Sequence, residues 1–253
     1  MISETRPRIV GVIPARLNSE RLPGKVLRNL AGRAMLHHVY EGARACPLLD
    51  ELVVATDAEA VQAYCAEHGI PVLMTSPAHR SGTERIHEVM QRIPADIFLN
   101  LQADEPLVGA DHVRLLIEPF FSDQDTQVST LKVALDAAAA ENPNVVKVVT
   151  DLRGRALYFS RVPIPFQRDP AFSPPYYKHL GLYGYRREAL AQYIQMPPSP
   201  LERAERLEQL RFLENGISIQ VVETVQDTIG VDTEEDWRVV SRLLASRSRS
   251  VAE

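Results

Sequence analysis

Short apolar runs without polar alternation recur through the first half of the chain. These runs are residues 9–13, 51–56 and 97–101. An unbroken apolar run of this length is typical of a strand that is covered on both faces of a parallel sheet. The segments between the runs have the apolar spacing of helices, and they are residues 34–46, 58–68 and 83–93. Strand alternating with helix predicts a doubly wound, mostly parallel α/β sheet, whose ligands bind at the carboxyl ends of the strands.

The pattern changes after residue 126. Three strand-like runs follow, at residues 127–135, 145–150 and 156–160. The turn Asp151-Leu-Arg-Gly154 predicts a hairpin between the last two runs. Eight of the 18 prolines lie within residues 163–200, so this segment is expected to be an ordered loop around one strand at residues 178–185.

Three further elements are expected near the end of the chain. The motif Ser199-Pro-Leu-Glu202 has the spacing of a capping box, which predicts a helix over residues 201–214. A strand at residues 217–223 and a helix from about residue 233 complete the fold. Residues 246–250, in which serine alternates with arginine, predict a solvated tail.

The composition is that of an ordinary globular protein, with 45% hydrophobic and 24% charged residues in a chain of 253. The net charge of -5 has the wrong sign for a broad nucleic-acid surface, so we expect no nucleic-acid partner. The charge is unevenly distributed, because residues 6–33 contain seven basic residues and one acidic residue. This local charge of +6 leaves -11 on the rest of the chain and predicts a focused site for a small anion.

Cys46 and Cys65 form no metal-binding or redox motif, and they are expected to be free thiols. Free thiols suit a reducing compartment. The first apolar run ends at Pro14 and is too short for the core of a signal peptide. No run approaches the ~18 apolar residues that a membrane helix needs. We therefore expect a cytoplasmic protein that does not insert into a membrane.

The first candidate site is the loop that follows the first apolar run. It carries the cations Arg16, Arg21 and Lys25, but it lacks the glycine and hydroxyl residues of a Walker loop, and the chain contains no G-x-G-x-x-G motif. Cations at the end of a strand can bind a triphosphate through charge and forked hydrogen bonds. A solvated basic loop is the alternative, and the spacing alone does not choose between the two.

A second candidate site consists of carboxylates. Asp104 follows a predicted buried strand, and Asp232 precedes the last predicted helix. Two carboxylates opposite a cationic loop suit a Mg²⁺ ion that also contacts phosphate oxygens. Asp232 or the adjacent Thr233 is also a natural helix N-cap. Ser81 and Glu84 likewise match either a capping box or a contact to a base or ribose, and spacing alone favours the caps.

Two residues of the second half also attract attention. Glu208 would share a helix face with Leu201 and Phe212 in the predicted helix, and a carboxylate among apolar side chains needs an arginine or a polar ligand as its partner. Among the histidines we single out His179, because it lies beside Lys178 at the mouth of a predicted strand.

Nine short motifs occur in order between residues 9 and 240. They are Pro14-Ala-Arg16, Arg21-Leu-Pro-Gly-Lys25, Ser81-Gly-Thr-Glu-Arg85, Asn100-Leu-Gln-Ala-Asp-Glu-Pro106, Asn142-Pro-Asn-Val-Val-Lys-Val-Val149, Tyr158-Phe-Ser-Arg161, His179-Leu-Gly-Leu-Tyr-Gly-Tyr185, Leu207-Glu-Gln-Leu-Arg211 and Gly230-Val-Asp-Thr233. Together they resemble the CMP-Kdo synthetase family, the 3-deoxy-manno-octulosonate cytidylyltransferases. The chain departs from that family at Ala103, where the family usually has glycine. The extra methyl group beside Asp104 could shift the backbone or alter the pocket.

The resemblance implies a role for each matched residue. The CTP phosphates would be held by Ala15, Arg16 and Lys25, and the cytidine by Ser81, Gly82 and Gln102. Mg²⁺ would be held by Asp104 and Asp232, and these two aspartates with Arg16 and Lys25 would form the catalytic set. The acid sugar would be bound by Arg21, Arg161, His179, Tyr183, Glu208 and Gln209.

The resemblance also implies a fold and a reaction. The fold would be that of the nucleotide-diphospho-sugar transferases, with an inserted hairpin and loop region for dimerisation and sugar binding. Residues 7–125 would form the nucleotide half, residues 126–246 the acid-sugar and dimerisation half, and residues 247–253 a tail. The enzyme would transfer CMP from CTP to 3-deoxy-D-manno-octulosonate (Kdo), and the product would be used for lipopolysaccharide synthesis in Gram-negative bacteria. It would act as a homodimer. The alternatives are a cytidylyltransferase for another acid sugar, such as 8-amino-Kdo or a sialic acid, and a non-catalytic nucleotide-binding protein.

Overall fold

A computed structural model describes residues 6–17 and 22–250 of the chain. Contacts divide the chain into two compact units: unit 1 contains residues 1–114 and 228–253, and unit 2 contains residues 115–227. The predicted boundary near residue 125 put the C-terminal helix in the second half. In the structure this helix belongs to unit 1, because Trp237 and Glu234 contact Arg28.

Unit 1 is built on four parallel strands in the order β6-β1-β4-β5. They are β1 (Ile9–Ala15), β4 (Glu51–Thr56), β5 (Val72–Met74) and β6 (Ile97–Asn100). Every residue of β1 is buried, as expected for a central strand with a helix layer on each face. The three strands predicted from unbroken apolar runs are confirmed. β5 is a strand of three half-buried residues, too short to give such a run.

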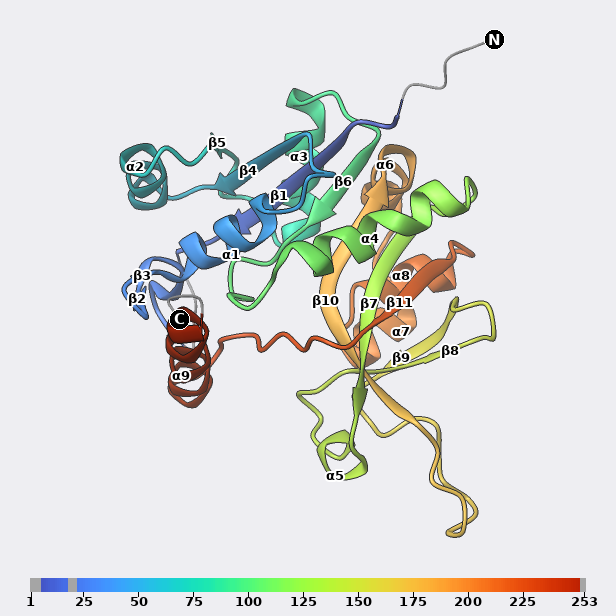
Figure 1. The fold of residues 1–253 in the computed structure, drawn as a ribbon. Helices are drawn as coiled ribbons and strands as arrows, with labels where there is room; N and C mark the ends of the chain where they lie inside the picture. Colours follow the sequence, from blue (N-terminus) through green and yellow to red (C-terminus); the bar gives the residue numbers. More distant parts are fainter. Residues whose placement is uncertain (1–5, 18–21, 251–253) are drawn as a thin grey trace. The chain divides into compact units, whose positions relative to one another are not determined.

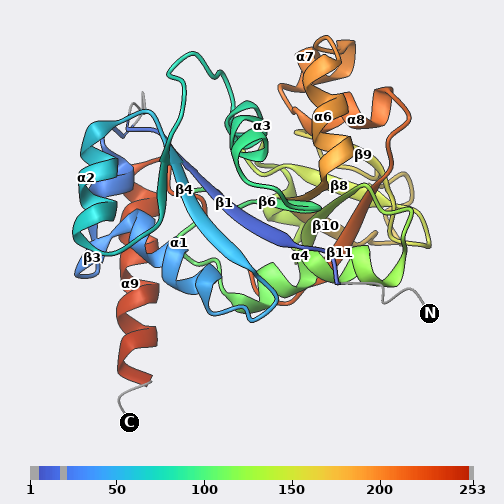
Figure 2. The same cartoon turned by 90° about the horizontal axis from the view of Figure 1, so that it is seen from above.

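Helices cover both faces of this sheet. They are α1 (Met35–Arg44), α2 (Glu59–Glu67) and α3 (Gly82–Arg92). The last helix, α9 (Glu234–Ser250), instead contacts Arg28 through Glu234 and Trp237. Figure 2 shows α3 on one side of β1 and β4 and α1 on the other, which confirms the doubly wound arrangement. The short elements η1 (Lys25–Leu27), β2 (Asn29–Leu30) and β3 (Arg33–Ala34) connect β1 to α1. The predicted tail begins too early, because the helical backbone of α9 continues to Ser250.

Unit 2 contains five strands, which Figure 1 shows together with the helices that follow them. The strands are β7 (Val128–Leu135), β8 (Lys147–Thr150), β9 (Ala156–Ser160), β10 (Tyr176–Arg186) and β11 (Ile219–Thr224). β10 pairs with β7 in the antiparallel sense, and β11 pairs with β7 in the parallel sense. The predicted hairpin is confirmed as β8 and β9.

A bulge interrupts β10. Leu180 pairs with Leu131 and Tyr183 pairs with Thr130, so two residues of β10 have no counterpart on β7 between these pairs. The bulge consists of Gly181 and Leu182, within the strand predicted at residues 178–185, and a glycine inside a strand is common at a bulge.

The helices of unit 2 correct two predictions. They are α5 (Ala137–Ala140), α6 (Arg187–Gln195), α7 (Pro200–Glu205) and α8 (Gln209–Glu214), and α4 (Ala110–Ser122) leads into the unit. The proline-rich segment was expected to be loop around one strand, yet its proline-free stretch forms α6. The single helix predicted over residues 201–214 is also wrong. The capping box at Ser199 is present, but Arg206 adopts a positive φ of 53° and ends α7.

No helix in the described part of the chain is long and apolar enough to cross a membrane.

Gly42 marks a close approach between α1 and the backbone that follows β6. A Cβ atom at Gly42 would lie 2.0 Å from the carbonyl oxygen of Val108. Because that neighbour is backbone, it cannot move aside as a flexible side chain could. We expect Gly42→Ala to lower the free energy of unfolding by about 1–3 kcal/mol, measured by urea denaturation.

The matched control for this substitution is Gly181→Ala. No atom lies within 4 Å of the Cβ position at Gly181, and its φ is not positive. We expect this variant to change the free energy of unfolding by less than about 1 kcal/mol. Equal losses in the two variants would contradict the role given to the Gly42 contact.

Candidate functional site

A cavity of about 210 Å³ lies in unit 1 where β1 and β6 end. Its lining residues come from the end of β1 and the loop after it, from η1, from the start of α3 and from the loop after β6. They are Pro14, Arg16, Lys25, Val26, Gly82, Gln102, Ala103 and Asp104. Five of these residues belong to the sites predicted from the sequence, and they lie at the carboxyl ends of parallel strands as expected.

Lys25 is the centre of the charged part of this site. Its Nζ atom donates hydrogen bonds to Asp104 Oδ2 at 2.7 Å, to Asp232 Oδ1 at 2.8 Å and to the carbonyl oxygen of Val231 at 2.9 Å. Burial acts to lower the pKa of Lys25, but the two carboxylates outweigh it and raise this pKa above its usual value. Lys25 is therefore a permanent cation between two anions.

The backbone brings the two aspartates together. Glu105 N donates to the carbonyl oxygen of Gln102 at 3.1 Å, which closes a turn around Asp104. Val231 N donates to the carbonyl oxygen of Asp104 at 2.8 Å and ties this turn to the segment before α9.

The structure also separates the two roles proposed for residues 232 and 233. Thr233 is the N-cap of α9, since its Oγ1 accepts a hydrogen bond from Asp236 N at 3.2 Å. Asp232 is not the cap, and its carboxylate contacts Lys25 instead. Asp232 therefore remains with Asp104 as a candidate metal ligand.

Two carboxylates at one point fit a hard cation such as Mg²⁺, which takes one or two protein carboxylates and completes its shell with water and phosphate oxygens. In this structure the Lys25 ammonium occupies the position between them, so a cation is already stabilised there by the same oxygens. No cluster of three or more His, Cys, Asp or Glu side chains suited to a metal ion occurs among the described residues.

The uncharged side of the cavity is formed by Gly82 and Gln102. A Cβ atom at Gly82 would lie 3.2 Å from Pro14 Cγ and 3.7 Å from Gln102 Nε2, so glycine keeps this side open. Gln102 Nε2 donates to Oδ1 of the buried Asn100 at 3.0 Å, which fixes the direction of the Gln102 amide. Ser81 is the N-cap of α3, as its Oγ accepts from Glu84 N at 3.3 Å. The cap predicted here is confirmed, while a nucleoside contact remains a prediction.

Ala103 is accommodated without backbone strain. It is buried beside the cavity, and it does not adopt the positive φ that would favour glycine. The departure from the family pattern therefore leaves the turn around Asp104 intact.

The contact of Arg28 with the first turn of α9, beside Lys25, was not predicted from the sequence. The Arg28 guanidinium contacts the carboxylate of Glu234 and lies 4.5 Å from the centroid of the Trp237 ring. It joins the end of η1 to the first turn of α9, next to the contact of Lys25 with Asp232. Because Arg28 and Glu234 are 206 residues apart, no local pattern could have indicated the pair.

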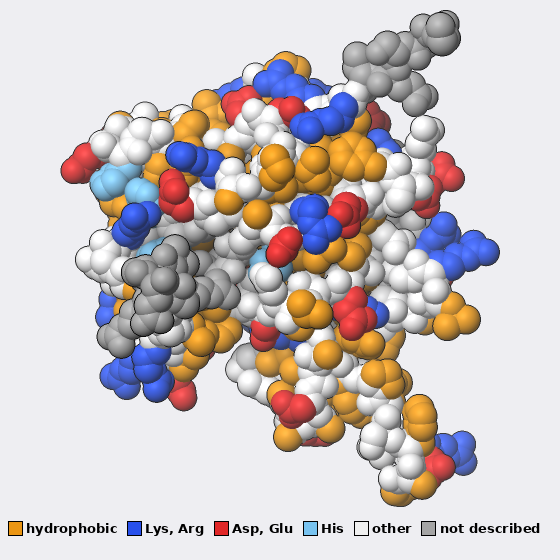
Figure 3. Space-filling model, in the orientation of Figure 1, with side chains coloured by type: hydrophobic (Ala, Val, Ile, Leu, Met, Phe, Trp, Pro, Cys, Tyr) orange, Lys and Arg blue, Asp and Glu red, His pale blue; other side chains and the backbone are white. Residues whose placement is uncertain are grey.

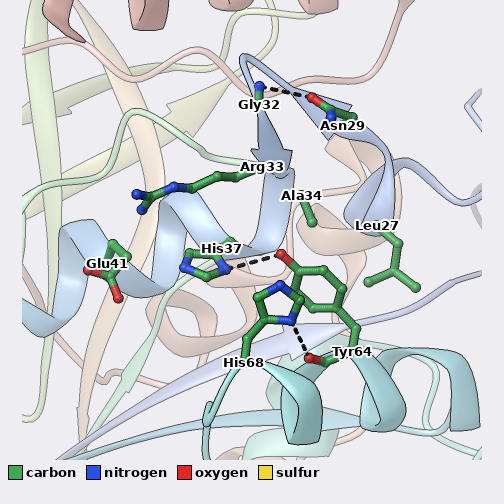
Figure 4. A pocket seen from close by; sticks show the side chains of 9 residues that line it. All are labelled: Leu27, Asn29, Gly32, Arg33, Ala34, His37, Glu41, Tyr64 and His68. Carbon is green, nitrogen blue, oxygen red and sulfur yellow. Dashed lines mark hydrogen bonds between the residues drawn. The ribbon is translucent and has the colours of Figure 1, made fainter.

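A second cavity in unit 1, of about 530 Å³, opens beside η1 and contains none of the predicted site residues. Figure 4 shows that rings line it: His37 Nδ1 lies 3.1 Å from the Tyr64 hydroxyl, and the Tyr64 ring stacks on His68. These side chains contact one another, so the three rings support one another at this cavity.

The residues predicted to bind an acid sugar lie in unit 2, except Arg21, which lies outside the described residues. His179 and Tyr183 are neighbours on β10, with ring centroids 5.4 Å apart. Gln209 is buried at the start of α8. The Arg161 guanidinium donates to the carbonyl oxygens of Glu205 at 2.7 Å and Pro143 at 3.1 Å.

The prediction that Glu208 lies among apolar side chains on one helix face is wrong. Glu208 is exposed and immediately precedes α8, because the backbone turn at Arg206 removes it from the apolar face of a continuous helix. Its Oε2 accepts a hydrogen bond from the Tyr193 hydroxyl at 3.2 Å. It remains a candidate for a polar ligand, but it is not a carboxylate buried among apolar side chains.

His179 is a neutral side chain in this site. Burial lowers the pKa of His179 to about 3, and the charge of Lys178 acts in the same direction. Its Nε2 lies 3.0 Å from Thr130 Oγ1, whose single hydrogen is directed to the carbonyl oxygens of Leu180 and Leu182. We therefore assign the Nε2 proton to His179, which leaves Nδ1 as an acceptor.

Phosphate chemistry at the ends of parallel strands is the common property of nucleotidyltransferases, and unit 1 has both the fold and the charges for it. Comparisons with known proteins agree with this class. The family model described as Cytidylyltransferase matches residues 10–219.

The relatives define the family more narrowly. A 3-deoxy-manno-octulosonate cytidylyltransferase from Koribacter versatilis (strain Ellin345) is 48% identical over 254 residues, covering 98% of this chain and 97% of the relative. One from Acidobacterium capsulatum is 51% identical over 241 residues, covering 95% of this chain and 98% of the relative. The chain belongs to the 3-deoxy-manno-octulosonate cytidylyltransferase family, so the predicted family and enzyme class are confirmed.

Solved structures agree on the fold. CMP:2-keto-3-deoxy-manno-octonic acid synthetase complexed with CTP aligns with a TM-score of 0.92 at 44% identity, covering 95% of this chain and 99% of that chain. A cytidylyltransferase from Leptospira borgpetersenii, at 15% identity, aligns with a TM-score of 0.64 over 95% of this chain and 88% of that chain, and it shares the fold alone. The predicted α/β fold class is confirmed.

The lowered pKa of His179 gives a testable pH dependence. A histidine whose pKa is lower in the folded state than its unfolded value of about 6.5 binds fewer protons when folded, so its contribution to stability is lost as the pH falls from 6.5 towards 3. Between pH 7 and pH 5 we expect the free energy of unfolding to fall by about 2 kcal/mol more in the native protein than in His179→Asn. Urea denaturation at both pH values measures this difference, and parallel pH dependences would show that folding does not lower the pKa of His179.

Proposed function

We propose that this chain transfers CMP from CTP to the anomeric hydroxyl of Kdo, giving CMP-Kdo and pyrophosphate for lipopolysaccharide biosynthesis. The observation that carries the proposal is the joint contact of Lys25 with Asp104 and Asp232 beside the cavity at the ends of β1 and β6. The names of relatives about half identical to this chain support the choice of substrates.

The residues of unit 1 would act by position and charge. Ala15, at the end of β1, Arg16 and Lys25 would bind the CTP phosphates, and Ser81, Gly82 and Gln102 would contact the cytidine. The anomeric oxygen of Kdo forms a bond to the α-phosphorus, the bond from that phosphorus to the bridging oxygen of pyrophosphate breaks in line, and the hydroxyl proton passes to solvent. Arg16 and Lys25 would stabilise the charge that develops on the departing pyrophosphate.

The donor set of Asp104 and Asp232 would hold Mg²⁺ in this proposal. When bound, such an ion neutralises phosphate oxygens and orients the reacting groups. The part of the two aspartates is to fix one edge of the nucleotide site, through backbone turns that already place both carboxylates against a cation.

The acid sugar would be bound by residues of unit 2 together with Arg21. A neutral His179 offers a hydrogen bond rather than a charge, so in this proposal the carboxylate of the sugar depends on the arginines Arg21 and Arg161 for its counter-charge. Tyr183, Glu208 and Gln209 would contact the sugar hydroxyl groups.

The proposed reaction is tested by the release of pyrophosphate from CTP in the presence of Kdo and Mg²⁺. We expect Asp104→Asn to lower turnover by about two orders of magnitude or more, because the substitution removes one of two anionic ligands at the nucleotide site. Asp111→Asn is the matched control, since Asp111 is an exposed carboxylate on α4 of the same unit.

Three outcomes would overturn parts of this proposal. Near-native pyrophosphate release by a folded Asp104→Asn protein would remove Asp104 from the site. Higher turnover with 8-amino-Kdo or a sialic acid than with Kdo would replace the sugar. Binding of CTP without release of pyrophosphate with any of these sugars would leave a nucleotide-binding protein. Release of pyrophosphate from UTP in place of CTP is the control for recognition of the base.

We also propose that two copies of this chain form a homodimer through unit 2. Large apolar side chains are exposed on β9 and on the segment between β9 and β10. They are Leu157, Val162, Phe166 and Phe172, with exposed fractions of 61% to 84%. Figure 1 shows the segment between β9 and β10 reaching the lower right of the view, where Figure 3 shows hydrophobic side chains at the surface. Exposed apolar side chains gathered in one region are typical of a protein interface.

The dimer is tested by size-exclusion chromatography with light scattering. We expect the native protein at about twice its chain mass of 28.3 kDa, and Phe166→Ser/Phe172→Ser at the mass of one chain. Phe121→Ser is the control, because Phe121 is also exposed but lies on α4. A monomeric native protein, or a dimer unaffected by the double substitution, would contradict this interface.

The same proposal places the enzyme in the cytoplasm, where CTP is made. Cys46 and Cys65 are both buried and form no disulfide, and burial raises the pKa of the Cys65 thiol to about 11. A thiol with this pKa is protonated at neutral pH. Two free cysteines suit a reducing compartment.

A further inference from the structure

All three hydrogens of the Lys25 ammonium are used within the protein. An ammonium group has three donors, and three oxygens lie within 2.9 Å of Lys25 Nζ, those of Asp104, Val231 and Asp232. In this arrangement no donor remains for a phosphate oxygen. The proposed function, on which this inference rests, nevertheless gives Lys25 to the triphosphate and the two aspartates to a divalent cation. The carboxylates that bind Lys25 in the structure are therefore the ones that would bind the cation.

The charges explain why a cation must lie between Asp104 and Asp232. Their carboxylates share one bridging ammonium, and they would repel each other without it. The Lys25 side chain is 9% exposed, whereas those of Asp104 and Asp232 are 33% and 41% exposed. The carboxylates are therefore reachable from solvent while the ammonium is held beneath them.

The Lys25 side chain can move its ammonium group while the backbone of η1 stays in place. Arg28 holds the other end of η1 to Glu234 and Trp237, so the backbone of this element has its own attachment to α9. The lysine side chain has four flexible carbon atoms between Cα and Nζ, and its Nζ lies beside the cavity that Arg16 and Gln102 also line. A side-chain movement alone can carry the ammonium towards that cavity.

We propose that Lys25 and a divalent cation compete for the carboxylates of Asp104 and Asp232, and that a triphosphate decides the competition by accepting the displaced ammonium. A metal that arrives alone must displace Lys25 from two carboxylate oxygens and leave the ammonium charge without a counter-charge. A metal that arrives with a triphosphate gives Lys25 new oxygen acceptors. Metal and nucleotide therefore bind with positive cooperativity, and by linkage each strengthens the other by the same factor.

The experiment measures the binding of Mn²⁺ by electron paramagnetic resonance, with and without CTP, in the absence of any sugar. For the native protein we expect CTP to strengthen the binding of Mn²⁺ by about tenfold or more, beyond the affinity of CTP itself for the ion. For Lys25→Met, which removes the competing cation, we expect Mn²⁺ alone to bind about tenfold more tightly than it binds the native protein. In this variant CTP should strengthen the binding of Mn²⁺ much less than it does in the native protein.

Matched variants locate the effect. Lys178→Met removes a lysine that pairs with Asp227 in unit 2, and it should leave the affinity for Mn²⁺ unchanged. Lys25→Met/Asp232→Asn should lose the gain seen in Lys25→Met, because one of the two contested carboxylates is gone. Lys25→Gln provides a neutral polar replacement if the methionine variant does not fold, and circular dichroism reports the folded state of each variant.

The competition is overturned if Mn²⁺ binds a folded Lys25→Met or Lys25→Gln protein no more tightly than the native protein. Lys25 would then only hold the two aspartates in position. This failure is distinct from failure of the proposed function, because pyrophosphate release by the native protein with CTP, Kdo and Mg²⁺ would still occur. Absence of both pyrophosphate release and CTP-dependent Mn²⁺ binding would reject the proposed function itself.

Discussion

The candidate site of unit 1 depends on one ammonium group shared by two carboxylates. Lys25 follows β1, Asp104 follows β6 and Asp232 precedes α9, so the contact joins residues that are 79 and 207 positions apart. The strands below these loops are held by apolar packing, whereas the loops themselves are held by charge. Ionic contacts can be exchanged for ionic ligands without disturbing the packed sheet. This division suits a site whose ligands are polyanions and cations.

The other contacts around the site keep its frame constant while its charges exchange. The cation–π contact of Arg28 with Trp237 anchors η1 independently of Lys25. Asn100 fixes the amide of Gln102, and Gly82 leaves space in front of it. These contacts lie around one cavity but come from four separate segments of the chain. The geometry of the site is therefore a property of the sheet edge and not of any single loop.

Local patterns predicted much of the fold, and contacts distant in sequence explain most of the rest. β1 was evident because a central strand needs an unbroken apolar run, whereas β5 is too short to show one. α6 was not predicted, because the whole proline-rich segment was expected to be loop although the part that forms α6 contains no proline. The exposure of Glu208 follows from the positive φ of Arg206. Arginine rarely adopts a positive φ, so the sequence does not predict this turn. The residues of the site were found mainly through resemblance, since their spacing alone left capping and solvation as alternatives.

The bulge in β10 has a consequence for how this part of the chain can vary. His179 pairs with Lys132 and Tyr183 with Thr130, so both side chains lie on one face of the sheet even though the pairing shifts between them. The shift preserves the face because the number of extra residues is even. Gaining or losing a single residue here would reverse every later side chain of β10, including the buried Tyr185. Length changes at this point are therefore restricted by parity, and a loss or gain of two residues is the smallest step that keeps the same aromatic side chains inside.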